Sequence, residues 1–513
     1  MKPLVEVPTI QAADGAAQAA GIPVATLMGR AGAAVAAAAS ALLGGVTGRR
    51  VVALCGKGHN GGDALEALAR LASRGAAAEA LLTADPATLD QEGQRCVALV
   101  REAGGRVRPF EPALAERLLG QADLVLDGLL GTGASGAPRG SAAAAISAAA
   151  ISAAAVSLVP VPVVAVDIPS GVDGATGAVA GAAITATVTV TFQAAKPGHV
   201  LPPGSERVGR LVVADIGLPL PADSPAWGIS EAADLAGLAL ATVPRHETHK
   251  RSRGVLLAIG GASGMGGAPL LMGLGARGGG FGLLVLAAPA SVAGEFAPVL
   301  PEALTTALPE ADGGITPAAV DACKRWLDEA TAVAIGPGLG RAPATRETVR
   351  QLLAAYDGPM VIDADGLFAL GTGEPLADRK GPTLVTPHAG EFARLAPDLG
   401  GTRLQQAAEG ARRWGVTVLL KGSDTVIASP DGPLAVNPTG VPALATGGTG
   451  DVLTGLCGTL LAQGLSPFDA ARLGAWVHGR AGALATGDLS PLSVAAGDVA
   501  RHLPAAFREL LPQ

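Results

Sequence analysis

The sequence predicts an α/β protein in which parallel sheets are covered by helices on both faces. Apolar runs of strand length recur along the chain, and each is followed by glycines or acidic residues and then by an Ala/Leu/Arg-rich helical pattern. Continuous apolar strands that alternate with helices are typical of parallel sheets with two buried faces. These runs lie at 51–55, 123–127, 163–167, 255–259, 332–335, 360–363, 383–386 and 416–420.

The length of the chain predicts more than one domain, because 513 residues exceed what one hydrophobic core usually organises. Between the third and fourth apolar runs the alternating pattern weakens into a segment with prolines, a basic cluster and one weak helix. We therefore expect domains at 1–218 and 251–513, joined by a linker at 219–250.

Composition and charge favour a cytoplasmic enzyme with small-molecule partners. The formal charge of −7 gives no overall positive field, so neither nucleic acid nor a membrane surface is an expected partner. The four cysteines lie far apart without a CxxC pair, which fits a reducing compartment. The N-terminus has acidic residues early and no continuous apolar core, so no secretory signal is visible.

One uncharged stretch, 140–166, is long enough to span a bilayer. Its alanines gain little in lipid, and Pro160 and Pro162 interrupt its last third. We expect instead an Ala-rich helix that leads through a short loop into a strand at 163–166.

The first candidate site follows the apolar run 51–55. Gly56, Gly58 and Gly61 have the GxGxxG spacing between a predicted strand and a predicted helix, so backbone amides at the helix start can face a pyrophosphate. A tight glycine turn without a ligand would have the same spacing. This alternative stays open, because no convincing ribose-binding acid ends the next strand. The motif alone therefore leaves both interpretations open.

Two further loops follow predicted strand ends on the same side of the sheet. Asp127 begins the sequence DGLLGTG and Asp167 begins DIPSGVD. Ligands of open parallel sheets bind at that edge, and the three loops together offer the carboxylates, amides and hydroxyl that suit a dinucleotide and a hard cation. Taken singly, each aspartate is more often a strand-end cap.

The set GKGHNGGD, DGLLGTG, VDIPSGVDGATG and TFQAAKPGH resembles the Rossmann-like epimerase domain of the NAD(P)H-hydrate repair family, over about residues 1–218. The resemblance implies that Asn60, Asp127 and Ser170 bind potassium. It also implies contacts to the hydrated dinucleotide from His59, Asn60, Gly61, Gly62, Asp63, Gly131, Thr132, Gly133, Ala134, Ser135, Gly136, Ala137 and Asp167.

Epimerisation at a hydroxylated ring carbon needs an acid and a base, and we expect Asp167 and Lys196 to be that pair. Without the resemblance, Lys196 is interpreted as a solvated surface lysine, because it precedes a Pro-Gly pair. His59 departs from the family, which commonly has Asn at this position.

The second candidate site is a glycine turn that opens an apolar helix. Gly447, Gly448, Thr449 and Gly450 can present free amides to a phosphoryl group. Asp451 follows, where a carboxylate can accept the proton of an attacking hydroxyl as phosphoryl transfer requires. An aspartate in a first helical turn is also common without such a role.

Other loops of the second half complete the pattern: GGASGMGGAP, GPGLG, DADGL, TPHAGE and KGSDT. With the glycine turn they resemble the ribokinase-like dehydratase domain of the same family, over about 250–513. The resemblance implies that the adenine nucleotide contacts Lys421, Gly422, Ser423, Asp424, Thr425 and Gly450, and that the hydrate contacts Ala268, Gly338, His388 and Asp451. Met265 departs from the family, which often has Tyr at this position. Without the resemblance, Lys421 is interpreted as a solvated lysine, because a lone lysine after a strand is usually solvated.

The resemblance implies a bifunctional enzyme that epimerises R- and S-NAD(P)HX and dehydrates S-NAD(P)HX to NAD(P)H with ADP, releasing AMP and phosphate. Potassium would serve the first domain and Mg²⁺ with ADP the second. We expect a homo-oligomer whose partners are NADHX, NADPHX and ADP. The alternative is a ribokinase-like small-molecule kinase fused to a non-catalytic dinucleotide-binding module. The preference for NADHX or NADPHX, and for ADP or ATP, stays open.

Overall fold

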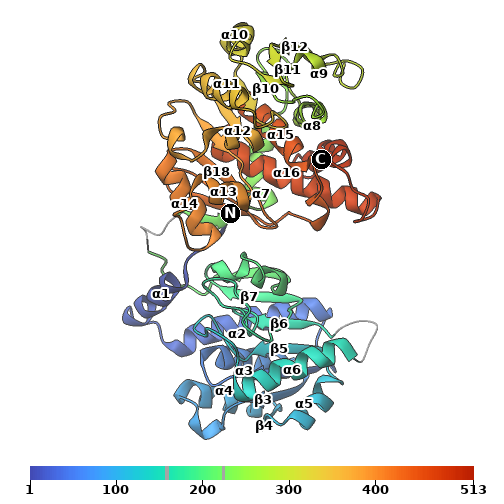
Figure 1. Cartoon of the computed structure of the whole chain (residues 1–513). Helices are drawn as coiled ribbons and strands as arrows, with labels where there is room; N and C mark the ends of the chain where they lie inside the picture. Colours follow the sequence, from blue (N-terminus) through green and yellow to red (C-terminus); the bar gives the residue numbers. More distant parts are fainter. Residues whose placement is uncertain (156–160, 222–225, 513) are drawn as a thin grey trace. The chain divides into compact units, whose positions relative to one another are not determined.

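The computed structural model describes residues 1–155, 161–221 and 226–512. It divides the chain into two compact units, Lys2–Pro225 and Ala226–Gln513. Each unit has its own sheet and its own hydrophobic core (Figure 1). Both units are α/β, as the sequence predicts.

The segment 219–250, which we expect to be a linker, contributes a strand and a helix to the second unit. These are β9 (Trp227–Ile229) and α7 (Ala232–Ala241). They are built into the unit because β9 pairs with a strand of its sheet, while α7 buries Leu235 and Ala239 in its core. Short apolar elements beside prolines carry too weak a periodicity to be separated from a linker by sequence.

The sheet of the N-terminal unit is parallel throughout its described strands. Its spatial order is β4 (Arg106–Pro109), β3 (Ala77–Leu82), β2 (Arg50–Cys55), β5 (Leu124–Gly128), β6 (Val163–Val166), β7 (Val188–Phe192) and β8 (Arg210–Ala214). The chain runs outward from β2 to β4 and then starts again at β5 on the other side of β2. This is the Rossmann-like order, and doubly wound sheets bind ligands where that order reverses, here between β2 and β5.

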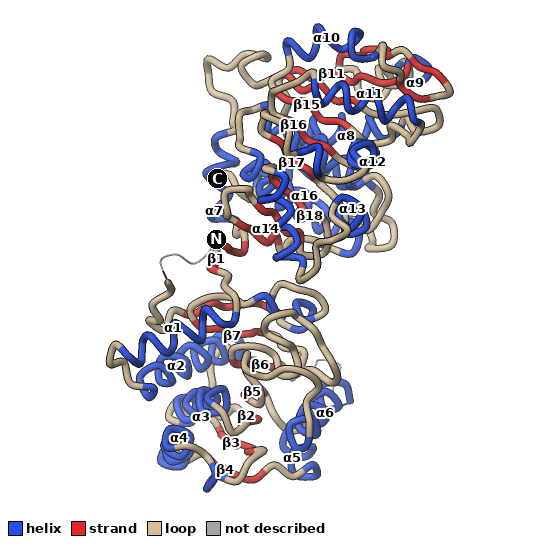
Figure 2. The backbone as a smooth tube through the Cα atoms, turned by 60° about the vertical axis from the view of Figure 1, so that its left-hand side comes forward, coloured by secondary structure: helices blue, strands red, loops and turns tan. Residues whose placement is uncertain are grey.

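Helices cover both faces of this sheet (Figure 2). One face carries α1 (Val7–Ala19), α2 (Val24–Leu43), α3 (His59–Ala72) and α4 (Gln91–Glu102), and the other carries α5 (Pro112–Leu119) and α6 (Gly140–Ala155). The residues of β2 alternate accordingly, because successive side chains of a strand point to opposite faces. Val51 and Ala53 pack with the first group of helices, whereas Val52 and Leu54 pack with the second.

Two segments bear on the question of a membrane. The stretch 140–166 forms α6 and β6, which confirms the expected helix and strand; residues 156–160 lie outside the described residues. By length and composition α2 is also long enough to cross a bilayer. Its Val35 and Ala39 are fully buried, and α2 packs against α3, as an apolar core helix does.

The sheet of the C-terminal unit is parallel over most of its width. In spatial order it contains β12 (Leu304–Leu308), β11 (Leu283–Pro289), β10 (Val255–Ile259), β15 (Ala332–Ile335), β16 (Met360–Ile362), β17 (Thr383–Val385) and β18 (Thr417–Leu420). Two antiparallel strands follow, β19 (Thr425–Ala428) and β20 (Leu434–Asn437), and then β9, parallel to β20. A separate short hairpin joins β13 (Glu310–Ala311) to β14 (Gly314–Ile315).

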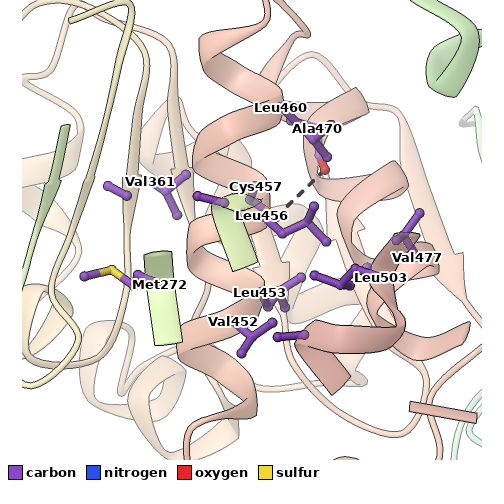
Figure 3. Packing of buried hydrophobic residues seen from close by; sticks show 14 of the residues in the cluster. Met272, Val361, Val452, Leu453, Leu456, Cys457, Leu460, Ala470, Val477 and Leu503 are labelled. Atoms are coloured by element: carbon purple, nitrogen blue, oxygen red, sulfur yellow. Dashed lines mark hydrogen bonds between the residues drawn. The ribbon is translucent and has the colours of Figure 1, made fainter. Parts of the chain in front are cut away.

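One face of this sheet packs against α8 (Gly267–Gly279), α15 (Thr449–Ala462), α16 (Pro467–Asp488) and α17 (Ala496–Arg508). Figure 3 shows α15 within this core, with Val452, Leu456 and Leu460 among buried side chains. The glycine turn before α15 is therefore anchored by a helix that is buried almost all round. Short α9 (Ala290–Ala293) lies by β11 and β12, and the remaining helices are α10 (Ala319–Glu329), α11 (Pro343–Ala354), α12 (Ala364–Leu370), α13 (Ala389–Leu395) and α14 (Arg403–Trp414).

The four cysteines are all buried and free. Burial raises the pKa of the Cys96 and Cys323 thiols to about 12. It also holds the pKa of the Cys55 and Cys457 thiols well above the usual range. The absence of a disulfide framework agrees with the spacing of the cysteines in the sequence.

Candidate active sites

The first site lies at the carboxyl ends of β2, β5 and β6, where the strand order of the N-terminal sheet reverses. The glycines after β2 serve the close packing of the loop against its neighbours. A Cβ on Gly61 would collide with the backbone of Gly56, and a Cβ on Gly56 would collide with the carbonyl of Leu129. Gly58, in contrast, faces open space. Two of the three motif glycines are therefore needed to bring the start of α3 against the sheet.

Asp167 and Lys196 form the central ion pair of this site. The Lys196 ammonium donates to Asp167 Oδ1 at 2.7 Å, to Thr191 Oγ1 at 2.7 Å and to the Phe192 carbonyl at 3.3 Å. Thr191 Oγ1 in turn donates to Asp167 Oδ1 at 2.9 Å. Only 1% of the Lys196 side chain is exposed, so Lys196 is not a solvated surface lysine.

The environment of Asp167 keeps its carboxyl ionised. Burial acts to raise the pKa of Asp167, but the charge and hydrogen bond of Lys196 outweigh burial, and the net effect is a lowered pKa. Thr132 Oγ1 also donates to Asp167, at 3.1 Å to Oδ2. The backbone of Asp167 is left-handed, with φ 62°, which is uncommon for a residue other than glycine.

His199 forms hydrogen bonds to the backbones of both Lys196 and Asp167. Its Nδ1 accepts from the Lys196 amide at 2.9 Å, so the proton of the neutral ring is on Nε2, which donates to the Asp167 carbonyl at 2.7 Å. Burial lowers the pKa of His199 to about 4, so the ring is neutral at pH 7. A buried neutral imidazole thus fixes the two backbones that carry the ion pair.

The residues predicted to hold potassium are brought together beside Leu130. Ser170 donates its hydroxyl to Asp127 Oδ1 at 2.6 Å and its amide to Oδ2 at 2.8 Å, while Ser170 Oγ accepts from the Leu130 amide at 2.9 Å. Asn60 donates to the Leu130 carbonyl at 3.0 Å. Burial raises the pKa of Asp127 to about 6 despite the hydrogen bonds from Ser170 and Leu129, and no lysine or arginine pairs with it in the described part of the chain.

Two adjoining cavities open at this site, of about 710 Å³ and about 250 Å³. The predicted residues that line one or both are His59, Asn60, Asp63, Gly131, Thr132, Gly133, Ala134, Asp167 and Lys196. The structure leaves Gly61, Gly62, Ser135, Gly136 and Ala137 outside both linings. The position of a Cβ on Gly62 is already taken by Met28, which shows why that glycine faces protein instead of a cavity.

Sequence reasoning missed one wall of this site. Ile10 from α1, and Val24, Leu27 and Met28 from α2, line the smaller cavity. Arg139, which lines the larger cavity, was missed as well. The apolar residues have the spacing of any helix that faces a core, so no sequence signal separates this wall from ordinary packing.

The second site lies at the carboxyl ends of β16, β17 and β18 and at the start of α15. Lys421 donates to Asp363 Oδ1 at 2.7 Å, and Thr454 of α15 donates to Asp363 Oδ2 at 2.7 Å. Burial acts to lower the pKa of Lys421, but Asp363 and Glu391 outweigh it and the net pKa is raised. Lys421 is therefore a fixed cation at this edge of the sheet.

Asp451 lies in the first turn of α15, after Gly448, whose φ of 89° turns the chain into the helix. Burial raises the pKa of Asp451 to about 7, with a further rise from the charge of Asp363 and an opposing effect of Lys421. A carboxyl that titrates near neutral pH is suited to accept and release a proton.

A cavity of about 400 Å³ lies beside Lys421. The predicted residues that line it are Lys421, Gly422, Ser423, Thr425, Gly450 and His388. Asp424 of the predicted set is outside this lining, as are Ala268, Gly338 and Asp451. His478, which the sequence analysis did not single out, lines the cavity from α16 and contacts the Thr449 carbonyl at 2.9 Å, and burial lowers its pKa to about 4.

The remaining predicted residues of this unit lie on neighbouring loops. His388 caps α13: its Nδ1 accepts from the amides of Gly390 and Glu391, so Nε2 carries the proton of the neutral ring. Ala268 and Gly338 are adjacent, since a Cβ on Gly338 would lie 2.8 Å from the Cβ of Ala268. Met265 is 40% exposed in the loop before α8, and Ala268 lies in the first turn of α8.

Fold and sites together define an α/β enzyme with a lysine–aspartate ion pair at the candidate site of each unit. Residues 24–198 match the family model described as YjeF-related protein N-terminus, and residues 256–505 match the one described as NAD(P)H-hydrate dehydratase. A bifunctional NAD(P)H-hydrate repair enzyme of Moorella thermoacetica is 40% identical over 479 residues, which cover 91% of this chain and 89% of that protein. The protein of the same name from Mycobacterium leprae is 39% identical over 91% of this chain and 90% of its own.

A solved structure of the ADP/ATP-dependent NAD(P)H-hydrate dehydratase of Bacillus subtilis, co-crystallised with ATP and Mg²⁺, is 33% identical. It covers 56% of this chain and 100% of its own, with a TM-score of 0.47. From the two family models and the full-length relatives, the chain belongs to the family of bifunctional NAD(P)H-hydrate repair enzymes.

Proposed function

We propose that this chain repairs hydrated nicotinamide cofactors in two reactions. The N-terminal unit interconverts R- and S-NAD(P)HX, and the C-terminal unit dehydrates S-NAD(P)HX to NAD(P)H with ADP as phosphoryl donor. The observation that carries the proposal is the presence of both acid–base centres in one member of this family: Asp167 with Lys196, and Asp451 with Lys421.

In the N-terminal unit, Asp167 acts as the base for the ring hydroxyl. Its lowered pKa keeps it ionised, and Thr132 and Lys196 hold the carboxylate at the cavity. Amides at the start of α3 lie where a pyrophosphate would bind, and the apolar wall from α1 and α2 suits the ring. Asn60, Asp63, His59 and the loop from Gly131 complete the contacts to the dinucleotide.

Asn60, Asp127 and Ser170 are proposed to hold a potassium ion. The fit rests on chemistry: oxygen donors suit a hard cation, and Asp127 is a buried carboxyl that has no cationic partner among the described residues. The ion would supply the missing positive charge and fix the loop at Leu130 that borders the larger cavity. Epimerisation should fall when potassium is replaced by tetramethylammonium, and Asp127→Asn should remove this dependence.

In the C-terminal unit, Asp451 acts as the base that takes the proton of the S-hydrate hydroxyl while that oxygen attacks the β-phosphorus of ADP. The bond to AMP breaks, and the phosphorylated hydroxyl then leaves as phosphate. The neighbouring ring carbon gives up a proton to water, and the new C=C bond restores the reduced ring. Lys421 and Gly450 line the cavity in which the phosphoryl oxygens are proposed to bind, and Gly422, Ser423 and Thr425 line it as well. Asp424, outside this lining, is proposed to contact the nucleotide with them. Ala268, Gly338 and His388 are proposed to contact the hydrate.

Magnesium is proposed to enter with the nucleotide and to neutralise its phosphates. Asp363, a candidate ligand at the end of β16, accepts hydrogen bonds from Lys421, Thr454 and the Ala364 amide. The described residues contain no cluster of three His, Cys, Asp or Glu that could hold a metal. These observations support a metal held chiefly by phosphate and water.

The test is a recovery assay with the whole chain, Mg²⁺, K⁺ and either ADP or ATP. An epimer mixture of NADPHX should be converted completely to NADPH, with release of AMP and phosphate from ADP. Recovery that stops at the S fraction would contradict the epimerase assignment. A stable phosphorylated product without NADPH would instead establish the small-molecule kinase.

We further propose that the protein is cytoplasmic and homo-oligomeric. Four free, buried thiols support a reducing compartment. Sedimentation of the purified chain in the presence and absence of nucleotide measures the oligomeric state, and a monomer under both conditions would contradict the proposal.

A further inference from the structure

Asp63 is a buried carboxyl to which the mechanism above gives no chemical step. It lies near the start of α3, is only 8% exposed, and lines both cavities of the N-terminal site, as Asp167 also does. Within the described ranges, the Asp63 carboxyl has neither a hydrogen-bond partner nor an ion-pair partner. Because Asp63 lines both cavities, its unpartnered carboxyl is available to a molecule bound there.

The epimerase site also needs a proton donor that Lys196 cannot supply. An ammonium has three N–H groups, and those of Lys196 are directed to Asp167, Thr191 and the Phe192 carbonyl. No proton of Lys196 is left for a ligand, because all three donors are used inside the protein. Lys196 is thus a positioning residue that holds Asp167 ionised.

The groups that face Asp63 favour its protonated form. Burial and the charges of Asp167, Glu66 and Asp14 all act to raise the pKa of Asp63. Lys196 pairs with Asp167, while Arg70 and Arg95 pair with Glu66. Lys57 and Arg139 line the larger cavity together with Asp63, but neither forms an ion pair with it in the described part of the chain. His59, on the same helix, is 3.7 Å from Asp90 and its side chain is 60% exposed.

The pKa values of the two carboxyls that share these cavities are therefore shifted in opposite directions. Burial opposes ionisation in both, but Asp167 has the Lys196 ammonium and its pKa is lowered, whereas Asp63 has only like charges. Two carboxyls whose environments separate their protonation states are the arrangement that general acid–base catalysis needs.

We propose that Asp63 is a second catalytic residue of the N-terminal site, the general acid that acts opposite the base Asp167. The inference rests on the proposed epimerase function. In the step, Asp167 takes the hydroxyl proton and the oxygen forms a C=O bond. The ring C–N bond breaks, and the nitrogen keeps the electron pair and takes the proton of Asp63.

Rotation in the opened chain then presents the other face of the aldehyde carbon to the nitrogen. Reclosure forms the C–N bond, returns one proton to Asp63 and gives the other to the new hydroxyl from Asp167. Both carboxyls end as they began, and no oxidant, reductant or water is consumed. Asp63 and Asp167 both line the smaller cavity, whose apolar wall from α1 and α2 suits the ring.

The experiment follows R-NADPHX turning into S-NADPHX by chromatography, without nucleotide, in the whole chain. For Asp63→Asn we expect kcat to fall by about 10²–10⁴-fold with little change in KM, and Asp63→Glu should restore part of the rate. The wild-type kcat should fall on the alkaline side as Asp63 loses its proton, and Asp63→Asn should lack this fall. Dehydration of S-NADPHX with ADP is the control in the same molecule and should be unchanged.

Three results would overturn the inference: an undiminished kcat in Asp63→Asn, a loss confined to KM, or a wild-type kcat without an alkaline fall. The last result needs no variant, so it holds even if Asp63→Asn does not fold. If the unaltered chain fails to epimerise NADPHX at all, the proposed function itself falls. If it epimerises and Asp63→Asn does so equally well, only the role of Asp63 falls.

Discussion

Each of the two sites contains a lysine–aspartate ion pair, but the two sites expose opposite members of the pair. Lys196 lies 2.7 Å from Asp167 and Lys421 lies 2.7 Å from Asp363, each pair with a threonine hydroxyl on the carboxylate. In the N-terminal unit the lysine is sealed, with 1% exposed, and the carboxylate is the more open partner at 13%. In the C-terminal unit the carboxylate is sealed, with 2% exposed, and the lysine is 21% exposed.

The exposed member of each pair matches the group that the site is proposed to bind. A carboxylate at a cavity can take a proton from a hydroxyl, whereas an ammonium at a cavity stabilises phosphoryl oxygens. In the second site the base must then be another carboxyl, and Asp451 is the candidate. In the proposed mechanism, the exposed member of the pair is a base, Asp167, in one unit and a phosphate-binding cation, Lys421, in the other.

The largest expected effect tests the base of the second site. Asp451→Asn removes the proton acceptor, so dehydration of S-NADPHX should fall by about 10²–10⁴-fold. Epimerisation by the same protein should be unchanged. The measurement is NADPH absorbance with ADP and Mg²⁺. Near-normal dehydration by this variant would show that Asp451 is not the base of the second site.

The next effect concerns stability. Lys196→Met leaves Asp167 buried without its cation, and removing one partner of a buried pair costs about 3–5 kcal/mol. Lys421→Met should cost less, because Lys421 is partly exposed. Hydrogen exchange resolved by peptide measures the free energy of unfolding of each unit. Tryptophan fluorescence does not report on the N-terminal unit, since all four tryptophans lie beyond residue 226. Equal losses of unfolding free energy in the two variants would contradict the prediction that the more buried lysine contributes more to stability.

The two activities should also respond differently to pH. Asp451 must be ionised to act as a base, and its pKa is raised to about 7, so the kcat of dehydration should rise with pH through about 7. The pKa of Asp167 is lowered, so epimerisation should persist at acidic pH values where dehydration has declined. Profiles of kcat against pH, recorded separately for the two reactions, test this; a shared acidic midpoint would contradict it.

The smallest effects are expected at Met265 and His59, the two positions that the sequence predicts to depart from the family. Met265 is exposed, so Met265→Tyr should change stability by no more than about 0.5 kcal/mol. We expect its effect to be a few-fold change in the KM for the hydrate in dehydration alone. His59→Asn is the matched change in the other unit and should alter epimerisation alone. A change in the other unit's reaction by either variant would show that the sites are coupled.

Strand ends and glycine turns could be predicted from the sequence because buried parallel strands are continuous apolar runs and their loops carry polar residues. The partners within the sites could not be predicted. Lys196 and Asp167 are 29 residues apart, and Lys421 and Asp363 are 58 apart, on loops that meet only through the order of the strands. Without that order, Lys196 has the local sequence of a solvated lysine.

Other parts of the sites carry no sequence signal at all. The α1 and α2 wall has the periodicity of any core-facing helix. His478 lies in the middle of an apolar helix, where a histidine is usually a satisfied core residue, and it reaches the glycine turn only because α16 packs beside α15. Asp63 was identified within the glycine motif, but its lack of a partner depends on which groups the fold places around it.

The burial of the four cysteines affects how this protein would respond to peroxide. Peroxides attack the thiolate form, and each thiol here has a raised pKa, so almost none is ionised at neutral pH. Cys55 ends β2 directly before the loop of the first site, and Cys457 lies on α15 two turns beyond the second. The two cysteines closest to the candidate sites are thus neutral thiols, which react slowly with peroxide. The chain should therefore keep its activity under oxidising conditions that inactivate enzymes with exposed thiolates.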